Sequence, residues 1–160
     1  AKGRWIDDAL MSMVQSNRIG SEILFAGGAT ACTDVTGFGL LGHLVEMAKP
    51  SEVDVELELQ ALPLLDGALD CVRNGIFSSL QPQNVRLRRA IRGDANGGRE
   101  SEILPLIFDP QTAGGLLATV PEAEAGNCVE TLRKAGYPTA TIVGSILPQS
   151  NHLEPITLVG

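Results

Sequence analysis

The sequence predicts an α+β fold in which helices pack on a mixed β-sheet. Two kinds of hydrophobic pattern alternate along the chain. Apolar residues recur at helical spacing through 40–48, whereas they alternate strictly with polar residues through 53–60. The 160 residues, 44% of them hydrophobic and 19% charged, suit one globular domain with a sizeable core. Together these observations predict a single domain of packed helices and strands over residues 1–160.

The first half of the chain contains two predicted helices and two predicted strands. An amphipathic pattern over 5–26 predicts a helix, bent near 18–20 and ended by Gly27-Gly28. A β-prone stretch, 30–36, runs into the helix at 40–48. Residues 53–60 predict a strand whose polar side chains all face water: Asp54, Glu56, Glu58 and Gln60.

The second half begins with short elements and ends in strands. Residues 93–99, GDANGGR, predict a loop. Four arginines precede it, and we interpret them as a solvated helix face rather than a phosphate contact: Arg86, Arg88, Arg89 and Arg92. The other predicted elements are, in order, a helix at 64–72, helical turns at 85–91, an apolar run at 103–108, a strand at 116–120, a helix over 121–135, and strands at 141–147 and 155–159.

Charge and cysteine content narrow the class of protein. The net charge is −7, which argues against nucleic acid or an acidic membrane surface as the main partner. The three cysteines are scattered without a C-x-x-C pair, so neither a zinc site nor a disulfide framework is predicted. We therefore expect a reduced, cytoplasmic protein, with Cys32 as a small buried core residue. No apolar run has the length of a membrane span, and the opening AKGRWIDD has no signal peptide.

The stretch ACTDVTGFGLLGH, residues 31–43, concentrates residues that a plain core does not need. Asp34 lies between Thr33 and Thr36, and Gly37 and Gly39 follow just before the predicted helix. The free N–H groups of a helix start attract anions. Mg²⁺ usually takes one or two carboxylates together with substrate phosphates and waters. The stretch therefore predicts a magnesium and phosphate site at a strand-to-helix junction.

Two other interpretations of this stretch remain open from the residues alone. In the first, Asp34 and Thr36 cap the helix and the glycines only make the turn. In the second, the glycines form the G-x-G-x-x-G fingerprint of dinucleotide binding, with Glu56 or Glu58 as the ribose-binding acid. The polar strand before the glycines disfavours that second interpretation, because dinucleotide-binding strands are normally apolar.

A second informative stretch is ILPLIFDPQTAGGLLATV, residues 103–120. Asp109, Gln111 and Thr112 lie at an abrupt turn between two apolar segments. From the pattern alone we favour a structural turn in which Asp109 accepts hydrogen bonds from backbone N–H groups ahead of it.

Both stretches resemble one family. ACTDVTGFGLLGHLVEMAK and FDPQTAGGLLATV closely resemble the C-terminal domain of selenophosphate synthetase (selenide, water dikinase), whose usual forms are near TDVTGFGLLGHL and DPQTSGGLL. Ala113 stands where Ser is commoner, and KGRWID and IVGSI also match. The resemblance covers nearly all of the chain. It places the chain in the superfamily of aminoimidazole ribonucleotide synthetase.

The resemblance implies a longer, homodimeric enzyme whose N-terminal domain carries most of the ATP and metal site. Such an enzyme makes selenophosphate, AMP and phosphate from ATP, water and selenide with Mg²⁺. By the same resemblance Asp34 is a magnesium ligand. The remaining implied site residues are Gly37 and Gly39 beside the phosphates, Thr33 and Thr36 orienting Asp34, and Asp109, Gln111 and Thr112 nearby.

The family's nucleophile, its essential lysine and its other metal-binding aspartates belong to the N-terminal half. This chain alone is therefore expected to be inactive, since phosphoryl transfer depends on positioned ligands and charge stabilisation. Two alternatives remain. One is a purine-pathway ligase-like relative with another substrate, and the other is a non-catalytic nucleotide- or partner-binding module.

Overall fold

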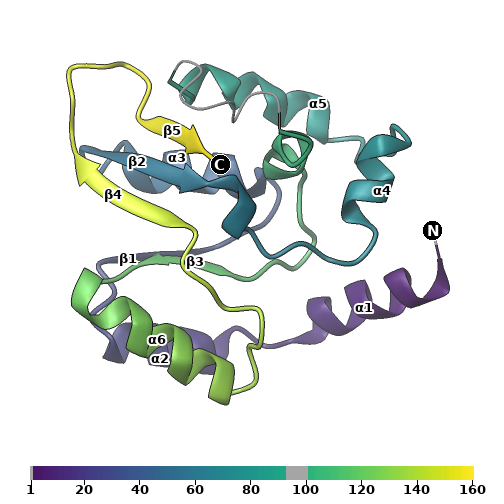
Figure 1. Cartoon of the computed structure of the whole chain (residues 1–160), viewed down its shortest axis with the longest axis horizontal. Helices are drawn as coiled ribbons and strands as arrows, with labels where there is room; N and C mark the ends of the chain where they lie inside the picture. Colours follow the sequence, from purple (N-terminus) through teal and green to yellow (C-terminus); the bar gives the residue numbers. More distant parts are fainter. Residues whose placement is uncertain (1, 93–100) are drawn as a thin grey trace.

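The computed structural model describes residues 2–92 and 101–160 (Figure 1). The loop predicted at 93–99 lies outside these residues. The α-helices are α1 (Gly3–Val14), α2 (Arg18–Ala26), α3 (Gly39–Ala48), α4 (Ala68–Arg73), α5 (Gln81–Asn84) and α6 (Glu122–Lys134). The strands are β1 (Ala31–Asp34), β2 (Val53–Glu58), β3 (Leu116–Thr119), β4 (Gly144–Pro148) and β5 (Ile156–Val159). Short 3-10 helices are η1 (Leu59–Ala61), η2 (Val85–Ala90) and η4 (Leu104–Phe108).

The predicted α+β class with a mixed sheet is confirmed, but the strands form two sheets. β2 is the centre of a mixed three-stranded sheet, with β4 antiparallel on one side and β5 parallel on the other. β1 and β3 pair antiparallel as a separate two-stranded ribbon. The ribbon joins the two informative stretches of sequence, because β1 precedes the first glycines and β3 follows the second motif.

The core lies where α3, η4 and the three-stranded sheet meet. Its largest fully buried side chains are Leu41, Leu57, Leu59, Ile107 and Ile156. Burial of each such side chain contributes about 1.5–3 kcal/mol relative to exposure. Leu117 carries the ribbon into the same core. On the other side of the ribbon lie α2 and α6, which form the lower layer in Figure 1. The ribbon is thus held between two packed layers.

The helix predicted over 5–26 with a bend near 18–20 is instead two helices, separated by residues 15–17. Tyr137, which follows α6, explains the break. Its hydroxyl donates to the Ser16 carbonyl at 2.7 Å and accepts the Gly20 N–H at 2.9 Å. These bonds hold the chain in a non-helical turn between α1 and α2. A long-range contact therefore decides where the helix breaks, three residues before the bend that the local pattern indicated.

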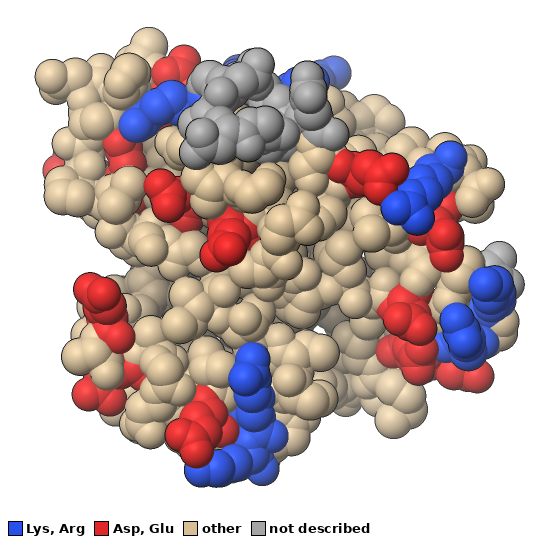
Figure 2. All heavy atoms as spheres, in the orientation of Figure 1, with Lys and Arg blue, Asp and Glu red and all other residues tan. Residues whose placement is uncertain are grey.

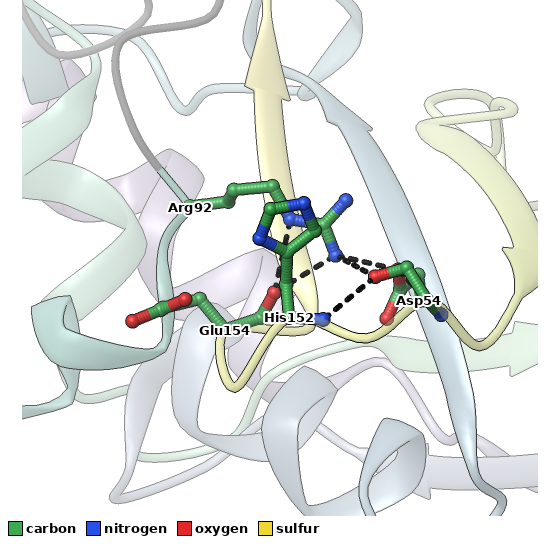
Figure 3. A network of polar contacts seen from close by, with 5 residues as sticks. Asp54, Arg92, His152 and Glu154 are labelled. Atoms are coloured by element: carbon green, nitrogen blue, oxygen red, sulfur yellow. Dashed lines mark hydrogen bonds and ion pairs between the residues drawn. The ribbon is translucent and has the colours of Figure 1, made fainter.

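Asp54 corrects the prediction that all polar side chains of β2 face water. It is only 4% exposed, because Arg92 reaches over it. The Arg92 guanidinium pairs with the Asp54 carboxylate, donates to the Ser150 hydroxyl at 2.8 Å, and donates to the Glu154 carbonyl at 3.0 Å (Figure 3). These contacts, with the Ser150 N–H donated to Asp54, hold the β4–β5 connection against β2. Hydrogen bonding from Ser150 first, and from Arg92 second, lowers the pKa of Asp54. Arg92 is thus a structural clasp rather than part of a solvated face.

On the face shown in Figure 2, basic side chains lie beside acidic ones around a broad uncharged area. Within residues 2–92 and 101–160, no helix is both long enough and apolar enough to cross a membrane.

Candidate functional site

The candidate site begins at the end of β1, where Asp34 is opposite Leu116 of β3. Alternation along the strand places Cys32 and Asp34 on the same exposed face. Cys32 is therefore not the buried core residue that was predicted. Partial burial first, and the nearby Asp34 charge second, raise the pKa of its thiol. In the described part of the chain, the Asp34 carboxylate accepts no hydrogen bond and forms no ion pair, so it is available to a ligand.

The turn after β1 joins the two motifs through backbone hydrogen bonds. The Val35 N–H donates to the Gly115 carbonyl at 2.9 Å. The Thr36 carbonyl then accepts two bonds, from Gly39 N–H and Gln111 N–H, each at 3.0 Å. Thr36 is therefore the residue at which the TDVTGFG and DPQTAGG segments are joined. Residues some 75 positions apart in sequence, 36 and 111, meet at one carbonyl oxygen.

Gly39 makes this junction possible by its lack of a side chain. Its φ is +69°, and an added Cβ would lie 2.9 Å from the Ile107 carbonyl oxygen and 3.0 Å from the Asp109 carbonyl oxygen. Only glycine tolerates both the left-handed backbone and this approach. The space expected beside phosphates at Gly39 is thus filled by the protein's own backbone. Gly37 is different, because it is exposed with open space around it, and its proximity to phosphate stays a prediction.

Asn84 is a residue that sequence reasoning missed. It is 7% exposed, and its amide donates to the Gly37 carbonyl at 2.9 Å and to the Phe108 carbonyl at 3.0 Å. One side chain of α5 therefore ties the first motif to the second. Nothing in its local sequence indicates this role, since Asn in a polar turn usually faces water.

His43 is the second residue that was missed. It is 6% exposed on α3, and its Nε2 accepts the Thr36 N–H at 3.0 Å. Neither Asp34 nor Thr36 caps this helix, because Phe38 occupies the N-cap position without a side-chain hydrogen bond. The capping interpretation is therefore wrong. The position of His43 in the motif is visible in the sequence, but its hydrogen-bond partner, the Thr36 N–H, is not.

The two threonines beside Asp34 do not orient its carboxylate in the described part of the chain. The Thr33 hydroxyl donates to the Asp34 backbone carbonyl at 3.2 Å, and the Thr36 hydroxyl lies 3.2 Å from His43 Nε2. The Thr33 hydroxyl thus bonds backbone, and the Thr36 hydroxyl contacts the His43 ring.

Asp109 is half-buried at the second motif. Burial raises the pKa of its carboxyl, and a hydrogen bond from the Ser78 N–H opposes that rise. The Asp109 carboxylate thus accepts a hydrogen bond from the α4–α5 connection. The turn interpretation had instead expected bonds from backbone N–H groups ahead of Asp109. Gln111 and Thr112 are exposed, and the Gln111 amide donates to the Asp109 carbonyl at 3.3 Å. A ligand role for these three residues stays a prediction.

The side chains near Asp34 can be compared with the ligands that Mg²⁺ takes. Across the described residues, His, Cys, Asp and Glu side chains do not gather in groups of three or more that could hold a metal ion. A free, exposed carboxylate at Asp34 fits Mg²⁺ only as one ligand among others, such as substrate phosphates, waters and carboxylates of another domain. The chain's own residues fit a shared site and not a self-contained one.

The dinucleotide interpretation fails on topology. A dinucleotide-binding βαβ unit needs two parallel strands of one sheet joined by the helix. Here β1 and β2, on either side of α3, lie in different sheets, and the partner of β1 is the antiparallel β3.

Comparison with known proteins gives the family. Residues 5–152 match the model of the AIR synthase related protein, C-terminal domain. The chain belongs to this family. The predicted resemblance to selenophosphate synthetase is also confirmed, because relatives named selenide, water dikinase match most of the chain. That of Clostridioides difficile is 34% identical over 89% of this chain, and that of Caldanaerobacter subterraneus subsp. tengcongensis is 38% identical over 90%.

The chain spans about two-fifths of the relatives it matches. It covers 41% of each of those two proteins, and 43% of the Rhizobium meliloti selenide, water dikinase, to which it is 36% identical.

Solved structures of the hydrogenase maturation protein HypE share the fold of this AIR synthase-related domain. One has a TM-score of 0.59 at 20% identity, covering 86% of this chain and 35% of that one. Another, in complex with ATP, has a TM-score of 0.61 at 18% identity, covering 92% and 38%. At this identity the likeness supports the fold alone.

Proposed function

We propose that this chain is the C-terminal domain of a selenide, water dikinase, which makes selenophosphate, AMP and phosphate from ATP, water and selenide. In this proposal the domain closes the nucleotide site and contributes Asp34 to the Mg²⁺ that holds the phosphates. The enzyme is cytoplasmic and homodimeric, and its N-terminal domain supplies the nucleophile and the other metal ligands. The names of the relatives support a phosphotransferase of the dikinase kind.

The observation that carries the proposal is the junction of the two motifs at Thr36. The Thr36 carbonyl is bonded from both sides, by Gly39 and Gln111, and Gly39 packs on the backbone of 107–109. This network makes a rigid support two residues from Asp34, whose carboxylate is left exposed. A ligand held on a rigid element pays less entropy when it binds a metal. A plain structural turn would not need an exposed, unpaired acid beside so many backbone constraints.

An uncovered helix supports the presence of another domain. No residue of α1 is buried, although it carries the exposed apolar side chains Ile6, Leu10, Met11, Met13 and Val14. A groove of about 430 Å³ lies between α1 and the loop at Gly136 and Pro138. Contiguous exposed apolar surface of this kind marks interaction sites. In the proposal this surface packs against an N-terminal domain. The chain covers 41% of one selenide, water dikinase relative, so that relative is long enough to contain such a domain.

The test is phosphorus NMR of the full-length protein given ATP, Mg²⁺ and selenide, beside its Asp34→Asn variant. Loss of one carboxylate charge with shape kept should abolish selenophosphate formation while the fold remains. Asp66→Asn, an exposed aspartate outside both motifs, is the matched control and should keep activity.

Equal turnover by wild type and Asp34→Asn would reject the metal role. Absence of selenophosphate from wild type would reject the substrate and favour the ligase-like or non-catalytic alternatives. The 160-residue chain alone should form no selenophosphate, and turnover by it would contradict the division of the site between domains.

A further inference from the structure

His43 is a buried titratable group to which the proposed function assigns no part. It lies on α3 with 6% of its surface exposed, and its ring is 5.6 Å from that of Phe38, centre to centre. A buried imidazole among apolar residues is costly unless its nitrogens are satisfied. One of them is satisfied by the backbone of the first motif.

The bond from Thr36 determines which ring nitrogen carries the proton. A backbone N–H can only donate, so His43 Nε2 must accept and is unprotonated. The neutral ring then carries its proton on Nδ1. That nitrogen is buried and makes no hydrogen bond in the described part of the chain. A Glu46 carboxylate oxygen lies 3.4 Å from it and favours the same tautomer by charge.

We infer that His43 is a positioning residue that holds the Thr36 junction, and through it Asp34, in the geometry the nucleotide site needs. The inference rests on the proposed function. Thr36 has its N–H bonded to His43 and its carbonyl bonded to Gly39 and Gln111. The Gln111 bond joins the two motifs, and the Gly39 bond closes the turn within the first motif. The N–H bond attaches this junction to the core helix. His43 thus anchors the turn to the core helix α3, whereas Asn84 holds it from α5.

The alternative is that His43 only fills space beneath the turn. Substitution of His43 by Leu or by Gln distinguishes the two roles. Leucine fills similar volume without an acceptor. Glutamine places an amide oxygen about as far from Cβ as Nε2 is, so it can accept the Thr36 N–H. A positioning role predicts rescue by Gln and not by Leu, whereas a filling role predicts the reverse.

The first experiment measures amide hydrogen exchange at Thr36 by NMR in this 160-residue chain, for wild type, His43→Leu and His43→Gln. Loss of the acceptor should speed Thr36 exchange about tenfold relative to core amides of α3, as expected for one lost hydrogen bond. His43→Gln should stay within about threefold of wild type. Leu44→Val, a neighbouring core change, corrects for general destabilisation. Unchanged Thr36 exchange in His43→Leu, or equal acceleration in Leu44→Val, would overturn the inference.

A second measurement on wild type does not depend on any variant folding. Long-range nitrogen-15 NMR of His43 should show an unprotonated Nε2 and a protonated Nδ1. A protonated Nε2 would overturn the inference directly.

Function is tested separately in the full-length protein. His43→Leu should weaken Mg²⁺–ATP binding and selenophosphate formation at least tenfold, with recovery in His43→Gln. If exchange responds as expected but neither variant alters binding or turnover, the inferred role toward the site is rejected. If wild type makes no selenophosphate while exchange responds, the proposed substrate fails and the anchoring of Thr36 stands.

Discussion

Replacement of Gly39 by alanine should destabilise the domain through two separate costs. A left-handed backbone at φ +69° costs a residue with a Cβ about 1–2 kcal/mol. The new Cβ would also lie 2.9 Å from the Ile107 carbonyl oxygen, and overpacking of this kind costs about 1–3 kcal/mol. Together they amount to about 3 kcal/mol, a large share of the ~5–15 kcal/mol that holds a domain together. For a domain of this size the melting temperature should fall by roughly 6–12 °C.

The assay is urea unfolding of Gly39→Ala beside Gly37→Ala. Gly37 lies in the same turn and has nothing within 4 Å of an added Cβ, so its substitution should change stability by less than about 0.5 kcal/mol. The slope of the transition should be the same in both variants, which shows that only native-state stability has changed. Equal losses in the two variants would refute the argument, because the cost would then not come from backbone approach at Gly39.

Three further predictions concern other parts of the fold. Asp54→Asn should flatten the acid side of the stability profile. The folded-state pKa of Asp54 is lowered by Ser150 and Arg92, so the stability that Asp54 contributes is present above its unfolded pKa and is lost as pH falls through its folded pKa. Thermal melts from pH 7 down to 3 measure this loss. Parallel wild-type and variant curves would count against the prediction. Cys32 should react with a thiol reagent in the native protein while Cys128 stays protected, and Asp34→Asn should speed the Cys32 reaction by lowering its pKa; an unchanged rate would mean that the two side chains do not interact. Tyr137→Phe should cost about 1–2 kcal/mol in urea unfolding, because two backbone groups lose a partner, and a loss below about 0.5 kcal/mol would show that water replaces the hydroxyl.

Much of the fold follows from local pattern. The alternation of Val53–Glu58 and the apolar spacing of Gly39–Ala48 predicted β2 and α3, because a strand or helix that covers a core must place apolar residues at its own period. The class of fold and the position of the candidate site at a strand-to-helix junction followed from the same reasoning.

The errors came from contacts between residues distant in sequence. Asp54 looked solvated because Arg92, 38 positions away, was not part of its pattern. Cys32 looked like a core residue because burial of a strand face depends on what covers it. The break between α1 and α2 depends on Tyr137, more than 115 positions away from either partner.

The sequence by itself predicted the class of fold and most of the helices and strands, and its motifs carried the resemblance to the family and the proposal of a metal role for Asp34. Helices and strands follow from residue order because periodicity is a local property, and a resemblance depends only on the order of residues within each motif. Only the tertiary structure decided that backbone carbonyl groups of 107–109 pack against Gly39, and that Asn84 and His43 hold the turn. A hydrogen bond between segments depends on how the chain folds back in three dimensions, and no local pattern encodes which distant carbonyl or N–H group a buried side chain will meet.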